Sequence, residues 1–329
     1  MRAKAAVAPP AVASSDRVRL VGLAGGAAVL IALFMVVQAA GMWDYVLPRR
    51  AVKVGAIALA GASIAVSTVI FQSITTNRIL TPAIMGLDRL YMLIQTATVY
   101  FLGSAHPLVS QSRLNFLLCT GAMGLFSLFV YRMFLGRRQA NVYVMLLIGV
   151  VFGTLFDSLS SFLLVLIDPN EFLVVQSRMF ASFNRVTSQL FWPASAAALA
   201  VMAYVARFMK YLDVLALGRD HAINLGVDYP KVVRQLLVAV FILVAVSTAL
   251  VGPVTFLGLI VANLAYELLD TYRRVPLMAA AVFISIIALV GGQLVVERVF
   301  VFSTPLPVII NFAGGILFLY LLFKERSAW

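Results

Sequence analysis

The sequence predicts an all-α membrane protein with about ten transmembrane helices. Its composition is the first observation, because 63% of its 329 residues are hydrophobic and only 12% are charged, whereas soluble domains carry about 25% charged residues. The second is the length of the apolar runs, most of which are close to the roughly 20 residues that cross the hydrocarbon core as a helix. A soluble fold could not bury this much apolar surface.

The predicted spans follow one another with short polar segments between them. The eighth is short and begins at Gly252-Pro253, so spans seven and eight could also form one kinked helix. A cleaved signal peptide is the alternative for the first span, which is longer than the roughly 7–15 residues typical of a signal core. The ten spans are residues 18–40, 51–73, 84–103, 114–134, 141–166, 190–209, 235–252, 254–270, 275–296 and 306–323.

The basic residues favour ten spans. The chain has 25 Lys and Arg against 13 Asp and Glu, and they lie in short loops rather than on one solvated face, which argues against nucleic-acid binding. Ten spans with both termini cytoplasmic place most of these basic residues inside, as the positive-inside rule requires. Arg49, Arg50 and Lys53 depart from the rule, because this orientation puts them outside.

Residues 1–17 are rich in Ala, Val, Pro and Ser and are predicted to form a disordered cytoplasmic tail, with the membrane domain at residues 18–329. The chain contains neither a phosphate-binding loop nor a His-Glu-x-x-His motif, and it has two histidines and one cysteine. These absences predict no catalytic residue, metal site or cofactor in this chain. Any ATP and Mg²⁺ would be bound by a separate ATPase subunit.

A polar interruption between apolar stretches is the most informative local feature. Residues 215–227 read Leu-Ala-Leu-Gly-Arg-Asp-His-Ala-Ile-Asn-Leu-Gly-Val. Glycines near both ends let backbones approach closely, and a short helix held between two spans can transmit rigid-body motion. We therefore expect this segment to receive force from a soluble partner. An ordinary solvated loop is the alternative.

Three motifs in order carry a family resemblance. Residues 215–227 resemble the pattern Leu-Ala-Leu-Gly-Glu-x-Ala-x-x-Leu-Gly-Val, and residues 252–261, Gly-Pro-Val-Thr-Phe-Leu-Gly-Leu-Ile-Val, follow at the family's spacing. Residues 77–86 are similar to the pattern Asn-Pro-Leu-Ala-x-Pro-x-x-Leu-Gly. The chain thus resembles the FecCD-type permeases of iron-chelate and vitamin B12 ABC importers.

The resemblance implies the architecture of a type II ABC importer permease. Two ten-helix subunits would line one pathway, with two ATPase subunits on the cytoplasmic side and a substrate-binding protein docking outside. It places the coupling helices, which seat in a cleft of the ATPase, within residues 210–234. The matching coupling residues are Gly218, Arg219, Asp220, His221, Ala222, Ile223, Asn224, Leu225 and Gly226.

The resemblance also gives the outer basic cluster a role. Arg50 and Lys53 match the two arginines of the family pattern Arg-Leu-Pro-Arg, which pair with acidic groups of the binding protein. Lys keeps the charge but loses the bidentate fork of Arg. Residues 168–179 match a short outer helix of the family, so Glu171 and Arg178 are expected on the same docking surface. Contact of the basic cluster with lipid headgroups is the alternative.

Two departures from the family pattern indicate a branch. Ala262-Asn263 stands where Pro-His is usual, and Asn77-Arg78 replaces Asn-Pro. Both resemble the two-permease importers of the petrobactin and anguibactin type, in which two different permeases pair. The resemblance therefore implies a heterodimer with a sister permease, with a homodimer as the alternative.

Polar residues within the fifth span are candidates for the pathway. Charges inside a membrane are costly and usually face protein or water, and Asp157 is the most isolated of them in the sequence. Hydrogen-bonded packing between helices is the alternative. The predicted pathway residues are Thr154, Asp157, Ser160 and Ser161.

Together these features predict a non-enzymatic permease in the bacterial cytoplasmic (inner) membrane. Its cargo would be a ferric siderophore, delivered by a binding protein and imported at the expense of ATP hydrolysed by the partner. Haem or a corrinoid is the alternative cargo. An ion-coupled secondary transporter is the alternative class, although it would need coupling-ion sites near the bilayer midplane.

Overall fold

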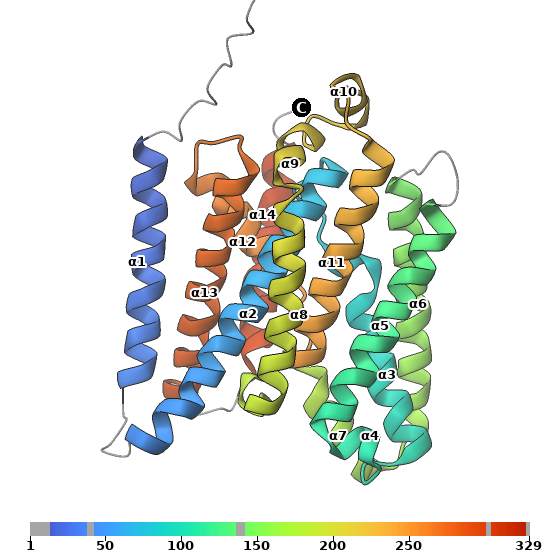
Figure 1. Ribbon diagram of the computed structural model, residues 1–329. Helices are drawn as coiled ribbons and strands as arrows, with labels where there is room; N and C mark the ends of the chain where they lie inside the picture. Colours follow the sequence, from blue (N-terminus) through green and yellow to red (C-terminus); the bar gives the residue numbers. More distant parts are fainter. Residues whose placement is uncertain (1–13, 38–42, 136–141, 301–303, 327–329) are drawn as a thin grey trace, which may run out of the picture.

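The computed structural model describes residues 14–37, 43–135, 142–300 and 304–326. This part of the chain is helical and contains no strand (Figure 1). Each of the ten predicted spans coincides with one of its helices. These are α1 Ser14–Val36, α2 Trp43–Thr75, α3 Leu87–Leu102, α5 Ser112–Leu135, α6 Val142–Leu166, α8 Ser188–Ala206, α11 Tyr229–Val251, α12 Leu257–Leu268, α13 Arg274–Arg298 and α14 Leu306–Arg326.

Short elements lie at the two ends of this bundle. At one end α9, Met209–Leu215, leads into α10, Arg219–Asn224, which projects beyond the long helices (Figure 1). We call this the α10 end. At the opposite end, the α7 end, are α4, Pro107–Ser110, and α7, Pro169–Met179. The 3₁₀ turns η1, Pro82–Met85, and η2, Phe183–Arg185, precede α3 and α8 respectively.

Several boundaries differ from the prediction for local reasons. Helix α2 begins at Trp43, eight residues before the predicted start, because Pro48 lies in the second turn and the helix continues through it. Helix α11 begins at Tyr229 rather than 235, because the Asp228 side chain caps it by accepting from the Lys231 backbone N–H at 3.4 Å.

The amino-terminal helix also starts earlier than predicted. Residues 14–17, expected in the tail, form the first turn of α1. Asp16 holds this turn in place, since its carboxylate accepts from the Asp270 backbone N–H at 3.3 Å and lies 3.7 Å from the guanidinium of Arg19. Residues 1–13 of the predicted tail lie outside the described residues.

Spans seven and eight are separate helices. Gly252 has φ +99° and ends α11, and the chain runs without helix to α12. Helix α12 has 12 residues and spans about 18 Å, less than the roughly 30 Å hydrocarbon core. The kinked-helix alternative is therefore wrong, because a glycine in the left-handed region terminates the helix before the proline.

The core lies around α2 and α11, most of whose residues are buried. Helix α2 packs against both α11 and α13, and α11 also packs against α5 and α8. Hydroxyl groups buried here donate to the preceding turn, as Ser73 does to the Val69 carbonyl at 2.7 Å and Thr75 to the Phe71 carbonyl at 2.9 Å. Such bonds satisfy polar groups that have no water to bind in a membrane.

Glycines allow α6 to approach the η1 turn at backbone distance. A Cβ atom on Gly149 would lie 2.9 Å from the Cα of Met85, and one on Gly86, whose φ is +77°, would lie 2.9 Å from the Cα of Gly153. Neither contact leaves room for a side chain. This close approach positions the start of α3 against α6.

We expect Gly149→Val to lower the stability of the purified protein by about 1–3 kcal/mol, because the added side chain must displace backbone. Thermal unfolding in detergent measures this. Gly124→Val is the control, since a Cβ on Gly124 of α5 meets no atom within 4 Å. Equal unfolding temperatures for the two variants would contradict the prediction.

Candidate functional site

At the α10 end, two glycines frame the short helix that contains most of the predicted coupling residues. Gly218 has φ +98° and Gly226 has φ +81°, and both bound the six-residue α10. Ala222 is fully buried, and its carbonyl accepts from the Val227 backbone N–H at 3.0 Å. One side of α10 is thereby anchored to the bundle while the other remains open.

The open side of α10 is an apolar tip with charged neighbours. Leu225 is 64% exposed, Ile223 45% and Leu217 59%, and Arg219 and Asp220 are exposed beside them. The tip lies beyond the long helices (Figure 1). Apolar side chains gathered on an element that projects from the bundle are typical of a protein interaction surface.

A basic groove lies at the α7 end. It has a volume of about 490 Å³ and is lined by the first turns of α2 and by the segment around η2. The lining includes Arg49, Arg50 and Lys53 from α2, with Phe183 and Asn184 opposite. The structure thus brings together the two predicted docking residues of α2, Arg50 and Lys53.

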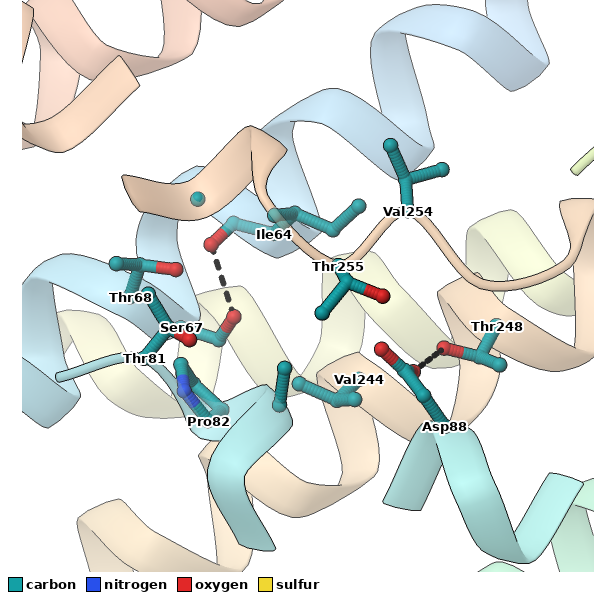
Figure 2. Close-up of a pocket in the computed structure, with 12 residues that line it drawn as sticks. Ile64, Ser67, Thr68, Thr81, Pro82, Asp88, Val244, Thr248, Val254 and Thr255 are labelled. Atoms are coloured by element: carbon teal, nitrogen blue, oxygen red, sulfur yellow. Dashed lines mark hydrogen bonds between the residues drawn. The ribbon is translucent and has the colours of Figure 1, made fainter. Parts of the chain in front are cut away.

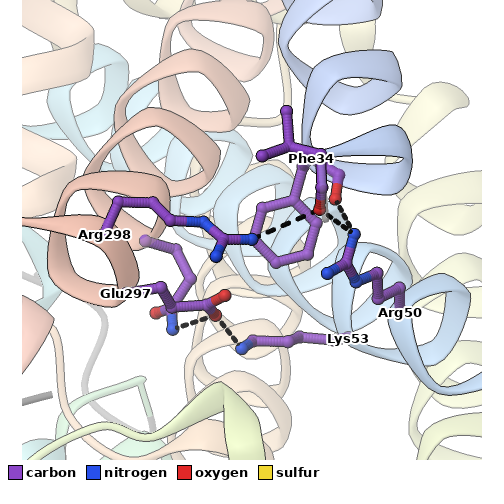
Figure 3. A network of polar contacts seen from close by, with 7 residues as sticks. Phe34, Arg50, Lys53, Glu297 and Arg298 are labelled. Carbon is purple, nitrogen blue, oxygen red and sulfur yellow. Dashed lines mark hydrogen bonds and ion pairs between the residues drawn. The ribbon is translucent and has the colours of Figure 1, made fainter. Parts of the chain in front are cut away.

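Both of these cations also hold helices together (Figure 3). Arg50 donates to the carbonyls of Phe34 at 2.9 Å, Met35 at 3.0 Å and Val37 at 2.7 Å, which are at the end of α1. Positive charge is favourable at a helix carboxyl terminus. Lys53 forms an ion pair with Glu297 near the end of α13. This network explains why the predicted outer side carries a basic cluster despite the positive-inside rule.

The other two predicted docking residues have partners within the chain. Glu171 on α7 accepts from the backbone N–H of Ser104 at 2.9 Å and from its hydroxyl at 3.0 Å. Arg178 donates to Oε1 of Gln95 at 2.7 Å and to the Val109 carbonyl at 2.5 Å. These bonds attach α7 to α3 and α4 and fix its position.

The predicted pathway residues do not share one environment. Asp157 lies 3.1 Å from the guanidinium of Arg89, and their side chains are 53% and 45% exposed. The expectation that Asp157 is isolated is therefore wrong, because α3 packs against α6 and brings Arg89 to it. Thr154 and Ser161 are exposed on α6. Ser160 is buried, with its hydroxyl 3.1 Å from that of Thr96.

An exposed ion pair on a spanning helix needs water or protein beside it, because a charge facing lipid is costly. Asp157 lies well inside the 25-residue α6, and few of the residues of this helix are buried. This face of α6 is therefore the candidate for contact with a partner chain or an aqueous pathway.

A small polar cavity was missed by the sequence analysis. Asp88, on the first turn of α3, accepts from the hydroxyl of Thr248 on α11 at 3.0 Å, and Thr255 points toward it from the segment before α12 (Figure 2). The cavity measures about 30 Å³. No local sequence pattern signals this contact, because Asp88 and Thr248 are 160 positions apart.

The model of the FecCD transport family matches residues 27–324. The chain belongs to the FecCD transport family. A family member from Bacillus subtilis, the petrobactin import system permease protein YclO, is 57% identical over 314 residues, which cover 95% of this chain and 99% of the relative.

Two further relatives come from one organism. The petrobactin import system permease proteins FatC and FatD of Bacillus anthracis are 36% and 25% identical, covering 86% and 84% of this chain and 80% and 81% of the relatives. A solved metal-chelate type ABC transporter in an inward-facing conformation has a TM-score of 0.79 at 19% identity, over 94% of this chain and 100% of that one. This structural likeness shows the fold of the present chain.

Within the described ranges, no group of three or more His, Cys, Asp or Glu residues could hold a metal ion. The relatives named above are permease proteins of import systems. Membership of this family, together with the seven helices among the described residues that are long and apolar enough to cross a membrane, makes the chain a multi-pass membrane permease.

We expect Lys53→Met to cost about 1–3 kcal/mol of stability, because it leaves the carboxylate of Glu297 without its cation in a largely buried site. Both side chains are 14% exposed. Glu297→Gln should cost a similar amount, and the double variant less than the sum of the two. Denaturant unfolding of the three variants measures the coupling. Additive losses would contradict a stabilising pair.

Proposed function

We propose that this chain is one permease subunit of an ATP-driven importer that carries a ferric siderophore into the cytoplasm. The observation that carries the proposal is the 57% identity, over nearly the full length of both chains, to a permease of a petrobactin import system. Haem or a corrinoid is less well supported, since a vitamin B12 import permease of Vibrio parahaemolyticus is 25% identical.

The proposed orientation puts the α10 end in the cytoplasm of a bacterium, with both termini there and the α7 end outside the cytoplasmic membrane. Support comes from the positive-inside rule. Arg207, Lys210 and Lys231 lie exposed beside α9 and α10. Arg50 and Lys53 are exceptions to this rule. Arg50 has carbonyl partners and Lys53 has a carboxylate partner, and these partners offset their charges.

Residues 210–234 are proposed to couple this chain to the ATPase. The apolar tip of α10 would enter a groove of the ATPase, with Gly218 and Gly226 allowing the sharp turns on either side. ATP and Mg²⁺ would be bound and hydrolysed there, and no cofactor would be held by this chain. Closure of the two ATPase subunits would then tilt the helices attached to α9 and α11.

The α7 end is proposed to receive the substrate-binding protein. The basic groove suits an acidic side chain of that protein, because Arg and Lys at its wall complement negative charge. Arg50 and Lys53 would contact it directly. Glu171 and Arg178 do not line this groove and would act by holding α7 in position through their hydrogen bonds to α3 and α4 and the turn between them.

A sister permease is proposed to cover the exposed face of α6. The FatC and FatD relatives are two permease proteins of petrobactin import in the same organism, which supports a heterodimer over a homodimer. Asp157, Arg89 and the exposed hydroxyls of α6 would line the pathway between the two subunits. Ser160 would instead hold α6 to α3.

We expect Leu225→Asp to weaken binding of the ATPase about 30-fold, because it removes an exposed apolar contact worth roughly 2 kcal/mol at an interface hot spot. Folding should be unaffected, since the side chain is 64% exposed. Co-purification measures ATPase binding, and ATP-dependent uptake into vesicles measures transport. Asp220→Lys and Gly226→Trp should act in the same direction.

Tyr272→Asp is the matched control. Tyr272 is 73% exposed and lies at the α10 end between α12 and α13, so its replacement should leave ATPase binding unchanged. Uptake that is independent of ATP and survives the α10 changes would contradict the importer and favour an ion-coupled transporter.

Reconstitution decides the subunit composition. We expect this chain and its ATPase to support uptake of a ferric siderophore only when a sister permease is present, because the exposed polar face of α6 requires a partner. Uptake is measured in proteoliposomes loaded with ATP, with the binding protein outside. Full transport by this chain and the ATPase without a second permease would contradict the heterodimer.

A further inference from the structure

A second polar pocket at the α7 end is distinct from the basic groove. It lies between α3, α5, α7 and the end of α11 and has a volume of about 80 Å³. Arg178 and Arg185 line it together with the hydroxyl-bearing residues Tyr91, Ser112 and Ser182. No carboxylate is among its lining residues.

The two arginines lack an anionic partner within the part of the chain that the structure describes. Arg178 donates to the neutral acceptors Gln95 and Val109, and Arg185 donates to the Phe180 carbonyl at 3.0 Å. Neither forms an ion pair with a described carboxylate. Burial lowers the pKa of the Arg185 guanidinium from its usual value; the nearby Tyr91 acts in the opposite direction, and the like charge of Arg178 lowers the pKa. An anion between them would relieve this repulsion.

Backbone contacts hold the pocket open as a fixed shape. The Ser182 backbone N–H donates to the Val251 carbonyl at 2.7 Å and ties the segment before η2 to the end of α11. A Cβ atom on Gly252 would lie 2.8 Å from the Cα of Ala181, so these backbones are in direct contact. On the other side, Asn115 donates to the Leu108 carbonyl at 3.1 Å. Preorganised donors bind an anion without paying for reorganisation.

We infer that this pocket binds one carboxylate-like oxyanionic group of the ferric chelate as the chelate enters from the binding protein. Guanidinium groups bind such oxyanions through paired, charge-assisted hydrogen bonds. The segment around η2 separates this pocket from the basic groove, to which it contributes Phe183 and Asn184. The pocket therefore lies beside the surface at which the binding protein is proposed to dock. The inference rests on the proposed function.

The first test measures anion binding by the purified permease complex, in nanodiscs of zwitterionic lipid. Inorganic phosphate is the probe, and sodium chloride at equal ionic strength is its control. Phosphate should raise the unfolding temperature of the unaltered complex, and Arg185→Gln should raise the half-saturating concentration about tenfold or more, since a charged hydrogen bond is lost. The half-saturating concentration for Arg185→Lys should lie between those of the unaltered complex and Arg185→Gln, because Lys keeps the charge but lacks the paired donors of Arg.

Arg113→Gln is the matched control. Arg113 is exposed near the amino terminus of α5, beside the pocket, but does not line it. Phosphate binding should be unchanged in this variant. Equal binding by Arg113→Gln and Arg185→Gln, or equal protection by chloride, would overturn the oxyanion site. Loss of phosphate binding in nanodiscs with phosphatidylglycerol would assign the pocket to lipid headgroups and overturn the chelate as its occupant.

The second test measures uptake of a radiolabelled ferric chelate with a carboxylate group. Arg185→Gln should reduce uptake about tenfold while the affinity of the loaded binding protein for the complex stays unchanged. Reduced affinity for the binding protein would make Arg185 a docking residue and overturn the inference. If the unaltered complex takes up no chelate, the proposed function is wrong, and so is the inference that a chelate occupies the pocket. Phosphate binding still decides the pocket itself.

Discussion

The structure depends on one constraint: polar groups within a membrane must find partners inside the protein, because lipid offers none. The hydroxyls of Ser73 and Thr75 on α2 donate to their own preceding turn. The end of α1 has its carbonyls satisfied by Arg50 of α2. Asp88 accepts from Thr248 across the α3–α11 contact. In each case a polar contact also fixes the relative position of two turns or two helices.

The same constraint explains where the helices are broken. Helices α3 and α12 are shorter than the other spans. Helix α3 begins directly after Gly86, and α12 begins a few residues after Gly252. Non-helical backbone of this kind is tolerated in a membrane only where protein or water covers it. Here α6 covers the first break, and the segment around Ala181 covers the second. Glycine is needed at both because a side chain would meet backbone.

The two ends of the bundle differ in chemistry, and this difference matches the two kinds of partner proposed. The α7 end presents arginines and lysine in a groove and a pocket, suited to acidic protein surfaces and anionic chelates. The α10 end presents apolar side chains on a short helix anchored by Ala222, suited to a protein groove. Between the ends, the exposed Asp157–Arg89 pair on α6 and α3 is compatible with a membrane only beside a partner or a pathway.

The sequence by itself determined the class, the ten helices and the family, because apolar run length, glycine position and motif order are local properties. It also located α10 and its framing glycines. Only the tertiary structure decided the pairs Lys53–Glu297 and Asp88–Thr248, whose members are 244 and 160 positions apart, and the pair Arg89–Asp157. It likewise brought Arg178 and Arg185 to one pocket. These contacts depend on how helices pack, and periodicity along a single helix does not encode which neighbour it meets.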